Sequence, residues 1–233
     1  VNDLFDRPNS GSLGPDWAVQ NGNATITNNQ LQGNTPWSTG WAMHTTYAAT
    51  YDQHVIRASW SQNAVGSRML LIAGCDASWS GVSVKIGDNI PSDMLADRVW
   101  FEAAVNAGSW FNQSSPVFFD LVPPIPSGTA TVWFTNAGDT VNVEIVGGGA
   151  VQTFSASGIL GSPFAPTGTN VGVGFFNPVQ IDDFQAWVGS PTEPGYTFTA
   201  ARSGYPASFL VTGATPLNNV ALGFSVTGAG PYP

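Results

Sequence analysis

The chain has 233 residues, of which 42% are hydrophobic and only 9% are charged. Its 15 acidic residues outnumber its 6 basic residues and give a formal net charge of −9. This balance excludes the basic surface that nucleic-acid binding needs, and it disfavours docking on an anionic membrane. No apolar run reaches the roughly 18–20 residues that span a bilayer, and the single cysteine, Cys75, excludes an intrachain disulfide.

Period-two alternation of apolar and polar residues runs through most of the chain. Val82, Val84 and Ile86, for example, lie on one face of a predicted strand, and Ser83 and Lys85 lie on the other. Turns rich in Gly, Pro, Asn and Ser separate such segments, a rhythm typical of an antiparallel β-sandwich. The segments with a strand pattern are 24–33, 54–62, 68–74, 80–89, 129–149 and 170–189.

Two segments predict a particular local structure. The segment 129–149 predicts a hairpin whose strands meet at a turn over 136–139. The segment 91–105 predicts the first turn of a helix, because Ser92 or Asp93 can cap its N-terminus.

A Pro- and Gly-rich run, 189–195, follows the last strand of the sandwich and predicts a boundary. We therefore expect a sandwich over 1–189, and a linker with a short, incomplete β-module over 190–233. Three short apolar segments in the second part are too few to close a core alone. They need a partner on the same chain or on another copy, and the apolar residues of this candidate self-assembly surface are Phe198, Phe209, Val211, Val220, Leu222 and Phe224.

Motifs at the two ends of the sandwich carry a family resemblance. The segment 2–33 contains Asn-Asp-Leu-Phe-Asp-Arg and Leu-Gly-Pro-Asp-Trp, and 172–189 contains Ile-Asp-Asp-Phe. These ends resemble concanavalin A-like (laminin-G-like) jelly-roll domains of secreted bacterial or phage-associated proteins, in which the last strand lies beside the first. The resemblance implies an all-β fold, an antiparallel jelly-roll β-sandwich plus a small C-terminal β appendage. It implies little about function, because this fold serves sugar-binding modules, glycosidases and phage accessories.

Four aspartates approach one another if the first and last strands pair: Asp3, Asp6, Asp182 and Asp183. Neighbouring carboxylates repel, and a hard cation such as Ca²⁺ relieves that repulsion. Related jelly rolls often hold a structural calcium there, so the resemblance implies a calcium site. The alternative is that Asp6 pairs with Arg7 or caps a turn. No other cofactor is expected.

Catalytic chemistry has little support in the sequence. Glycoside hydrolysis needs two carboxylates about 5–10 Å apart, and glycosidases of this fold carry a Glu-x-Asp-x-x-Glu type of strand that this chain lacks. The glutamates are Glu102, Glu144 and Glu193, and the first two suit the polar face of a strand. His44 and His54 lie outside any metal-binding motif. The sequence predicts that the protein is not an enzyme.

Nine tryptophans are many for this length. We expect Trp17, Trp100 and Trp187 to be buried, because large sandwiches bury aromatic residues. Exposed rings elsewhere can stack on sugar rings or contact another protein subunit. The tryptophans in loop-like stretches, which are the candidate ligand-binding residues, are Trp37, Trp41, Trp79 and Trp110.

Two functional hypotheses follow. The first is an extracellular, non-catalytic structural or adhesive subunit, secreted or on a cell or virion surface. It would assemble into fibres or a surface layer by pairing strands with copies of itself or with a surface protein. The alternative is a carbohydrate-binding module that holds a polysaccharide through loop tryptophans. Neither hypothesis involves nucleic acid or membrane insertion.

Overall fold

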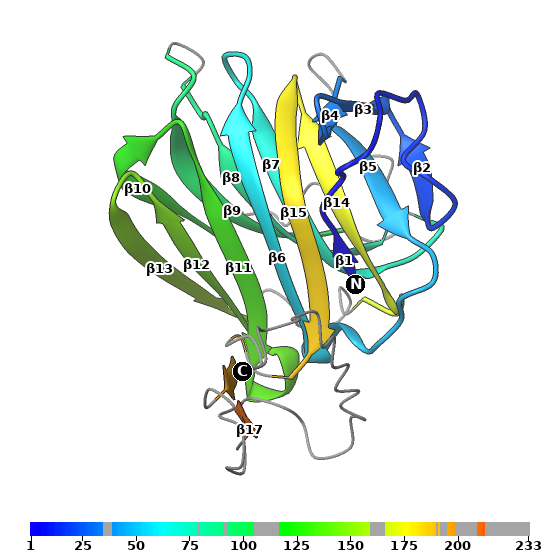
Figure 1. Ribbon diagram of the computed structural model, residues 1–233. Helices are drawn as coiled ribbons and strands as arrows, with labels where there is room; N and C mark the ends of the chain where they lie inside the picture. The colour runs from blue at the N-terminus through cyan, green and yellow to red at the C-terminus, as the bar shows by residue number, and fades with distance from the viewer. Residues whose placement is uncertain are drawn as a thin grey trace, which may run out of the picture. The chain divides into compact units, whose positions relative to one another are not determined.

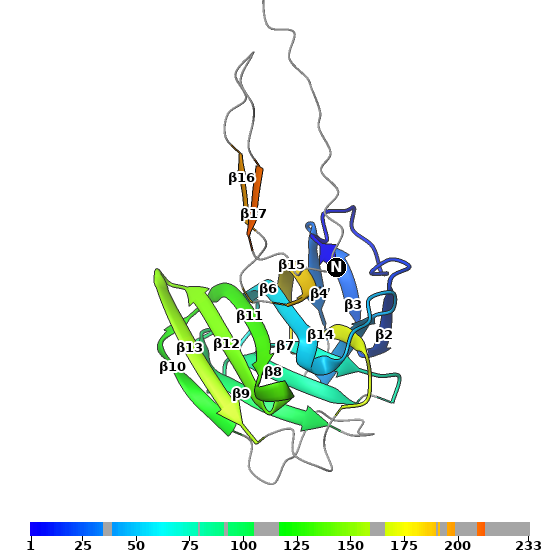
Figure 2. The ribbon, with the colours of Figure 1, turned by 90° about the horizontal axis from the view of Figure 1, so that it is seen from below.

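The computed structural model describes residues 1–34, 39–78, 80–90, 93–104, 117–158, 166–189, 191, 195–198 and 209–212. The chain divides into two units, Val1–Pro191 and Thr192–Pro233. Two antiparallel sheets stack face to face in the first unit (Figures 1 and 2), which confirms the predicted β-sandwich. Among the described residues, no helix is long and apolar enough to cross a membrane.

Eight strands form sheet A in the described residues, in the order β13-β12-β11-β6-β15-β4-β3, and β1 also pairs with β15. The loop between β11 and β12 contains a short 3-10 helix, Asn136–Gly138, at the turn that the sequence predicts. The strands are β1 (Asn2–Asp3), β3 (Ala24–Thr27), β4 (Gln30–Gly33), β6 (His54–Gln62), β11 (Ser127–Thr135), β12 (Thr140–Gly147), β13 (Ala150–Ser157) and β15 (Val179–Val188).

Seven strands form sheet B in the same part of the chain, in the order β10-β9-β8-β7-β14-β5-β2. A second 3-10 helix, Tyr51–Gln53, lies between β5 and β6. The strands are β2 (Trp17–Asn21), β5 (Thr39–His44), β7 (Arg68–Cys75), β8 (Gly81–Gly87), β9 (Ala96–Ala104), β10 (Val117–Ile125) and β14 (Asn170–Phe176).

The first and last strands of the sandwich are neighbours, as the terminal motifs predict. Asn2 of β1 lies opposite Gln185 of β15, and Asp3 lies opposite Phe184. The N-terminal ammonium group donates to the carbonyl of Ala186 at 2.7 Å. The two ends of the unit are therefore joined by backbone pairing (Figure 1).

The predicted helical turn over 91–105 is wrong for its described residues, most of which form strand β9. Asp93 Oδ1 does accept the backbone N–H of Leu95, at 3.1 Å, so it caps a turn. The chain then pairs with β8 and β10 instead of continuing as a helix. Val99 and Phe101 enter the core, and this tertiary pairing overrides the local cap signal.

The hydrophobic core lies between the two sheets and follows the strand alternation. Trp17 packs edge-on against Phe184, with 5.1 Å between ring centroids, and lies 5.8 Å from Phe5. Gly33 is required beside Phe175, because a Cβ at position 33 would come within 2.4 Å of Phe175 Cβ. Burying each such ring stabilises the fold by roughly 1.5–3 kcal/mol.

The second unit contributes one described hairpin, β16 (Gly195–Phe198) and β17 (Phe209–Thr212). Phe198 lies opposite Phe209, and Tyr196 lies opposite Val211. Three of the predicted self-assembly residues, Phe198, Phe209 and Val211, are thus in strands. The other three, Val220, Leu222 and Phe224, lie outside the described residues.

Candidate functional site

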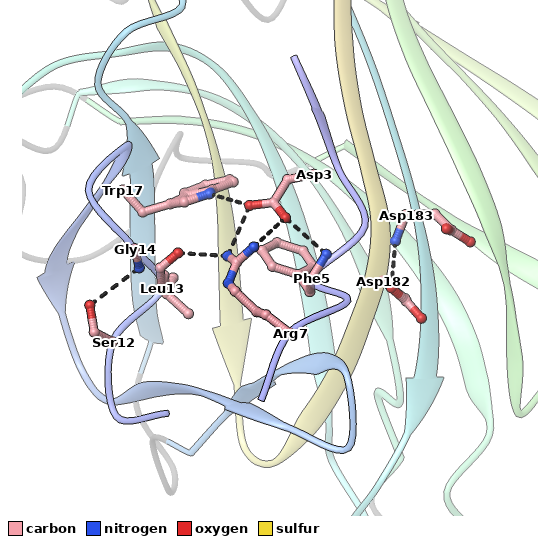
Figure 3. Close-up of polar contacts among 9 residues, drawn as sticks. All are labelled: Asp3, Phe5, Arg7, Ser12, Leu13, Gly14, Trp17, Asp182 and Asp183. Atoms are coloured by element: carbon pink, nitrogen blue, oxygen red, sulfur yellow. Dashed lines mark hydrogen bonds and ion pairs between the residues drawn. The ribbon is translucent and has the colours of Figure 1, made fainter. Parts of the chain in front are cut away.

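The Asp3 carboxylate organises the N-terminal segment (Figure 3). Its Oδ1 accepts the N–H of Phe5 and Arg7 Nη1, both at 2.8 Å, and its Oδ2 accepts Arg7 Nη2 at 3.0 Å and Trp17 Nε1 at 2.7 Å. Arg7 Nη2 also donates to the carbonyl of Leu13 at 2.6 Å. Burial raises the pKa of Asp3, but the bonds from Arg7, Phe5 and Trp17 outweigh it and hold that pKa below its usual value. We call these five residues the Asp3 cluster.

The four aspartates of the predicted calcium site do not form one group. No three acidic, His or Cys side chains gather among the described residues in a way that could hold a metal ion. Asp3 is occupied by its four hydrogen bonds, and it is Asp3, not Asp6, that pairs with Arg7. Asp182 and Asp183 lie on β15, away from Asp3 (Figure 3). The calcium stays a prediction, now without Asp3 as a ligand.

Asp182 and Asp183 lie at an irregularity in β15, where the pairing with β6 shifts between Asp182 and Gln185. Asp183 has a φ of 49°, which is unusual for a residue other than glycine. Burial raises the pKa of Asp182, and the Asp183 and Asp6 carboxylates raise it further. This bulge directs two carboxylates to the outer face of sheet A.

A small polar pocket of about 120 Å³ lies at this bulge. Its side chains largely bond to one another: Ser61 donates to Gln180 at 3.1 Å, and Gln30 donates to Asp182 at 3.4 Å. It is smaller than the roughly 300–1,000 Å³ of pockets that enclose whole ligands. Its lining residues are Gln30, Ser59, Trp60, Ser61, Gln180, Asp182 and Asp183.

The outer face of sheet B, opposite the core, has an unusual composition. Strand register places Lys85 of β8 between Leu70 of β7 and Trp100 of β9, and it places Ser83 opposite Glu102. Aromatic and charged side chains therefore share one face, although they are far apart in the sequence. We call this group the Trp100 face, and its members are Arg68, Ser83, Lys85, Arg98, Trp100, Glu102, Phe118 and Phe176.

A buried ion pair lies at the centre of the Trp100 face. Lys85 Nζ and Glu102 Oε1 are 2.5 Å apart, and the two residues are 6% and 5% exposed. Lys85 Nζ also lies 4.9 Å from the centroid of the Trp100 ring. Burial raises the pKa of Glu102 and lowers the pKa of Lys85, and each charge offsets part of the effect on the other.

Two polar atoms beside this ion pair have no hydrogen-bond partner among the described residues. They are Glu102 Oε2 and Ser83 Oγ, both buried. The two residues are cross-strand neighbours, so the two atoms belong to one part of the face. A buried polar atom without a partner costs about 1–3 kcal/mol. Two such atoms close together indicate a place where a water molecule or a ligand hydroxyl can bond to both.

Arg68 lies beside the ion pair and is held between two rings. Its Cζ is 4.8 Å from the Trp100 centroid and 5.0 Å from that of Phe176. Its Nε donates to the carbonyl of Asp88 at 3.2 Å. Gly87 makes room for the side chain, because a Cβ at position 87 would come within 2.7 Å of Arg68 Cγ.

Arg98 extends the same face towards the edge strand β10. Its Cζ lies 4.2 Å from the centroid of Phe118, which is 47% exposed. Its guanidinium pairs with Asp120, at 2.9 Å between Nη2 and Oδ1. Register aligns Asp120, Arg98, Gly87 and Arg68 across four neighbouring strands. The two arginines therefore lie in one row across the sheet.

Trp41 does not lie exposed in a loop, so that expectation is wrong. It belongs to strand β5 and is 0% exposed, packed with Leu70, Ile72 and Cys75 on the outer face of sheet B. The preceding Gly40 in "STGWAMH" suggests a loop in sequence, but Gly40 pairs with Phe175 inside the sheet. The other candidate tryptophans, Trp37, Trp79 and Trp110, lie outside the described residues.

The three tryptophans expected to be buried differ in where they lie. Trp17 is in the core cluster, as expected. Trp100 is also buried, as expected, but on the outer face of sheet B. Trp187 is half-buried in β15 and shares its register with Val55 and Trp133 on the outer face of sheet A. The alternation of β9, with Phe101 inward and Trp100 outward, is the signal that could have separated them.

The two histidines fill structural positions. His44 packs edge-on against Trp17 at 5.1 Å between ring centroids, and His54 Nε2 contacts the carbonyl oxygen of Ala49 at 2.8 Å. Burial lowers the pKa of both. Glu144 lies in β12, opposite Thr131 and apart from Glu102, which is in the other sheet.

Comparison with known proteins identifies the type of fold. No protein-family model and no curated protein sequence matches the chain. Among solved structures, the carbohydrate-binding module CBM66 from Bacillus subtilis is similar with a TM-score of 0.51 at 13% identity, over 73% of this chain and 94% of that one. The fold is the concanavalin A-like jelly roll. This confirms the resemblance at the two ends of the sandwich.

Two glycosidases are similar to the same extent. A β-1,3-1,4-glucanase (lichenase) derived from a mouse hindgut metagenome has a TM-score of 0.50 at 10% identity, over 80% of this chain and 97% of that one. A native glycosidic hydrolase has a TM-score of 0.50 at 11% identity, over 83% and 96%. Identities this low establish the fold alone, and function must be argued from the residues.

Proposed function

We propose that the sandwich unit is a non-catalytic carbohydrate-binding module and that its ligand binds on the Trp100 face. One observation carries the proposal: aromatic rings and hydrogen-bonding groups are interleaved on a sheet face that does not pack on the core. Trp100 and Phe118 are cross-strand neighbours there, beside Arg68 and Arg98. The Phe118 ring, 47% exposed, offers flat apolar contact to a sugar face, and the polar groups bond to hydroxyls. Trp100 is 7% exposed and packs against Arg68 and Lys85. The fold is also that of a named carbohydrate-binding module.

The carboxylates of this face support binding rather than hydrolysis. Strands β9 and β10 contain three carboxylates: Asp97 accepts the N–H of Asn89 at 2.6 Å, and Glu102 and Asp120, which lie on the face, are each in an ion pair. Asp120 lies opposite Arg98, and residues 98 to 102 span about 13 Å along β9. Glycosidases need their two carboxyl groups about 5–10 Å apart. This pair is therefore poorly placed to act together on one glycosidic bond.

Self-assembly is the second candidate, and one observation favours it. The β16–β17 hairpin has two strands of four residues in the described part of its unit. A two-stranded sheet is marginally stable alone and gains from a further strand or a covering surface. Pairing with another copy would supply that strand and would make the chain an adhesive subunit with a sugar-binding domain. An extracellular place, on a cell or virion surface, suits both roles.

Affinity electrophoresis of the full chain in gels that contain single polysaccharides tests the proposal. We expect at least one polysaccharide to retard the protein, and Phe118→Ala to weaken that binding about tenfold, which corresponds to about 1.4 kcal/mol. Phe118 is half exposed, so its loss should leave the fold intact. Trp133→Ala, a half-buried aromatic residue on the outer face of sheet A, is the matched control. The proposal would be wrong if no polysaccharide retards the protein, or if Trp133→Ala reduces the retardation and Phe118→Ala does not.

A further inference from the structure

The two Nη groups of the Arg68 guanidinium, which we call its fork, are open for hydrogen bonding. Arg7, Lys85 and Arg98 each pair with a carboxylate. Arg68 has one hydrogen bond, from Nε to the carbonyl of Asp88, and its two Nη groups donate to no described residue. In a chain with 15 acidic and 6 basic residues, an arginine that forms no ion pair with a described carboxylate is unexpected. The Nη groups of Arg68 are therefore candidates for bonds to a ligand.

The fork is also held in place before any ligand arrives. The Trp100 and Phe176 rings lie 4.8 and 5.0 Å from Arg68 Cζ, and the Nε bond fixes the rotation of the group. The missing side chain at Gly87 lets the stem lie flat across β8. An arginine ordered in this way loses little freedom on binding, so more of each new hydrogen bond contributes to affinity.

We propose that the ligand is an acidic saccharide and that Arg68 binds its carboxylate through both Nη groups. A guanidinium fork matches a carboxylate bidentately, with two parallel charge-assisted bonds. The Phe118 ring, 47% exposed beside Arg98 on the same face, supplies apolar contact for a sugar ring. The inference rests on the proposed carbohydrate-binding function and specifies its ligand class.

The charge of the protein limits how acidic that saccharide is. The net charge of −9 repels a dense polyanion, and the Glu102 and Asp88 carboxylates near Arg68 add to the repulsion. One carboxylate that reaches Arg68 alone avoids most of this cost. The best match is a mostly neutral polysaccharide with isolated uronate groups, rather than a sulfated or fully ionised polymer.

Calorimetric titration of the full chain with matched neutral and acidic saccharides tests the assignment. Suitable pairs are xylo-oligosaccharides without and with one glucuronate branch, and methyl-esterified pectin oligosaccharides without and with one free galacturonate. We expect the acidic member of at least one pair to bind about tenfold more tightly. Arg68→Gln should remove this preference while binding of the neutral member persists, and Arg68→Lys should keep part of it.

Controls separate this inference from the function on which it rests. Arg57→Gln, on the outer face of sheet A, should keep the preference, and melting curves should show that both glutamine variants fold. A neutral saccharide bound equally well in both members of each pair would overturn the acidic assignment but not carbohydrate binding. Absence of binding to either member of both pairs would overturn the acidic assignment, and carbohydrate binding falls as well if no polysaccharide retards the protein in gels. A preference that survives Arg68→Gln, or that free acetate reproduces without sugar, would also overturn the assignment.

Discussion

Two charged clusters of the sandwich unit combine an ion pair with a tryptophan, and they differ in how completely they are bonded. In the Asp3 cluster each carboxylate oxygen accepts two hydrogen bonds, from Phe5, Arg7 and Trp17. On the Trp100 face, Glu102 uses one oxygen for Lys85 and leaves the other without a partner among the described residues. Ser83 Oγ beside it and the two Nη groups of Arg68 also lack a hydrogen-bond partner within the described part of the chain.

This difference separates a structural role from a binding role. A carboxylate with all its acceptor sites filled has no capacity left for a ligand, and it holds the chain in one conformation. Unfilled polar atoms on a face with ordered rings lower stability, and a ligand that completes their bonds recovers that loss. The Asp3 cluster thus fixes the conformation of the N-terminal segment, and the Trp100 face is the candidate site for ligand binding.

The largest expected effect is on stability, at the Asp3 cluster. Asp3→Ala leaves Arg7 and the Trp17 indole N–H without their partner and should lower the free energy of unfolding by about 4 kcal/mol. Binding of saccharides should be unchanged in the folded fraction. Chemical denaturation measures the first and calorimetry the second. Asp6→Ala, at an exposed residue, is the control and should stay within about 0.5 kcal/mol of wild type.

The next effect is at the ion pair of the Trp100 face. Glu102→Gln leaves the buried Lys85 charge without a counter-ion and should destabilise the protein by about 3 kcal/mol. The double variant Lys85→Met/Glu102→Leu removes both charges and should recover most of that loss. Denaturation of the three proteins measures this. If Glu102→Gln is as stable as wild type, the pair is not buried as described.

The pH dependence should have opposite signs in the two clusters. The folded-state pKa of Asp3 is lowered, so its contribution is complete above its unfolded pKa of about 3.9 and disappears as the pH falls through the lower folded value. The folded-state pKa of Glu102 is raised, so its carboxyl costs stability as the pH rises above its unfolded pKa of about 4.3.

Thermal melts between pH 2 and 7 measure these slopes. Asp3→Asn should flatten the acid limb of the stability curve, whereas Lys85→Met/Glu102→Leu should make stability rise more steeply with pH above about 4.3, because the opposing contribution of Glu102 is gone. An acid limb that is steeper in Asp3→Asn than in wild type would contradict the assignment of the Asp3 pKa.

The smallest expected effect concerns calcium. If Asp182 and Asp183 hold an ion at the β15 bulge, EDTA should lower the melting temperature by a few degrees, because a ligand bound only to the folded state stabilises it. Asp182→Asn should remove that response. A melting temperature that EDTA leaves unchanged in wild type ends the calcium prediction.

Much of the fold could be predicted because local patterns determine it. The alternation of Val82, Val84 and Ile86 gives a strand, and the motifs around Asp3 and Phe184 bring the first and last strands together. The Trp100 face could not be predicted in the same way. Lys85 and Glu102 lie in different strands, and only the register between β8 and β9 brings them together.

The errors have the same origin. Asp93 is a good cap in isolation, yet pairing with β8 and β10 makes the following residues a strand. Trp41 follows a glycine in a loop-like sequence, yet it packs on Leu70 from another strand. The position of Lys85 was a usable signal: the only lysine of the chain alternates with core residues, which places it on the opposite face.

Backbone and indole NMR spectra of the full chain, titrated with the polysaccharide fragment that binds best, locate the binding face. We expect the largest chemical-shift changes on the Trp100 indole and on residues of β7, β8, β9 and β10 next to Arg68 and Phe118. Residues of the Asp3 cluster and of the pocket at Asp182 should change little. Changes concentrated at the β15 bulge on sheet A, with the Trp100 indole unmoved, would show that the ligand does not bind on the Trp100 face.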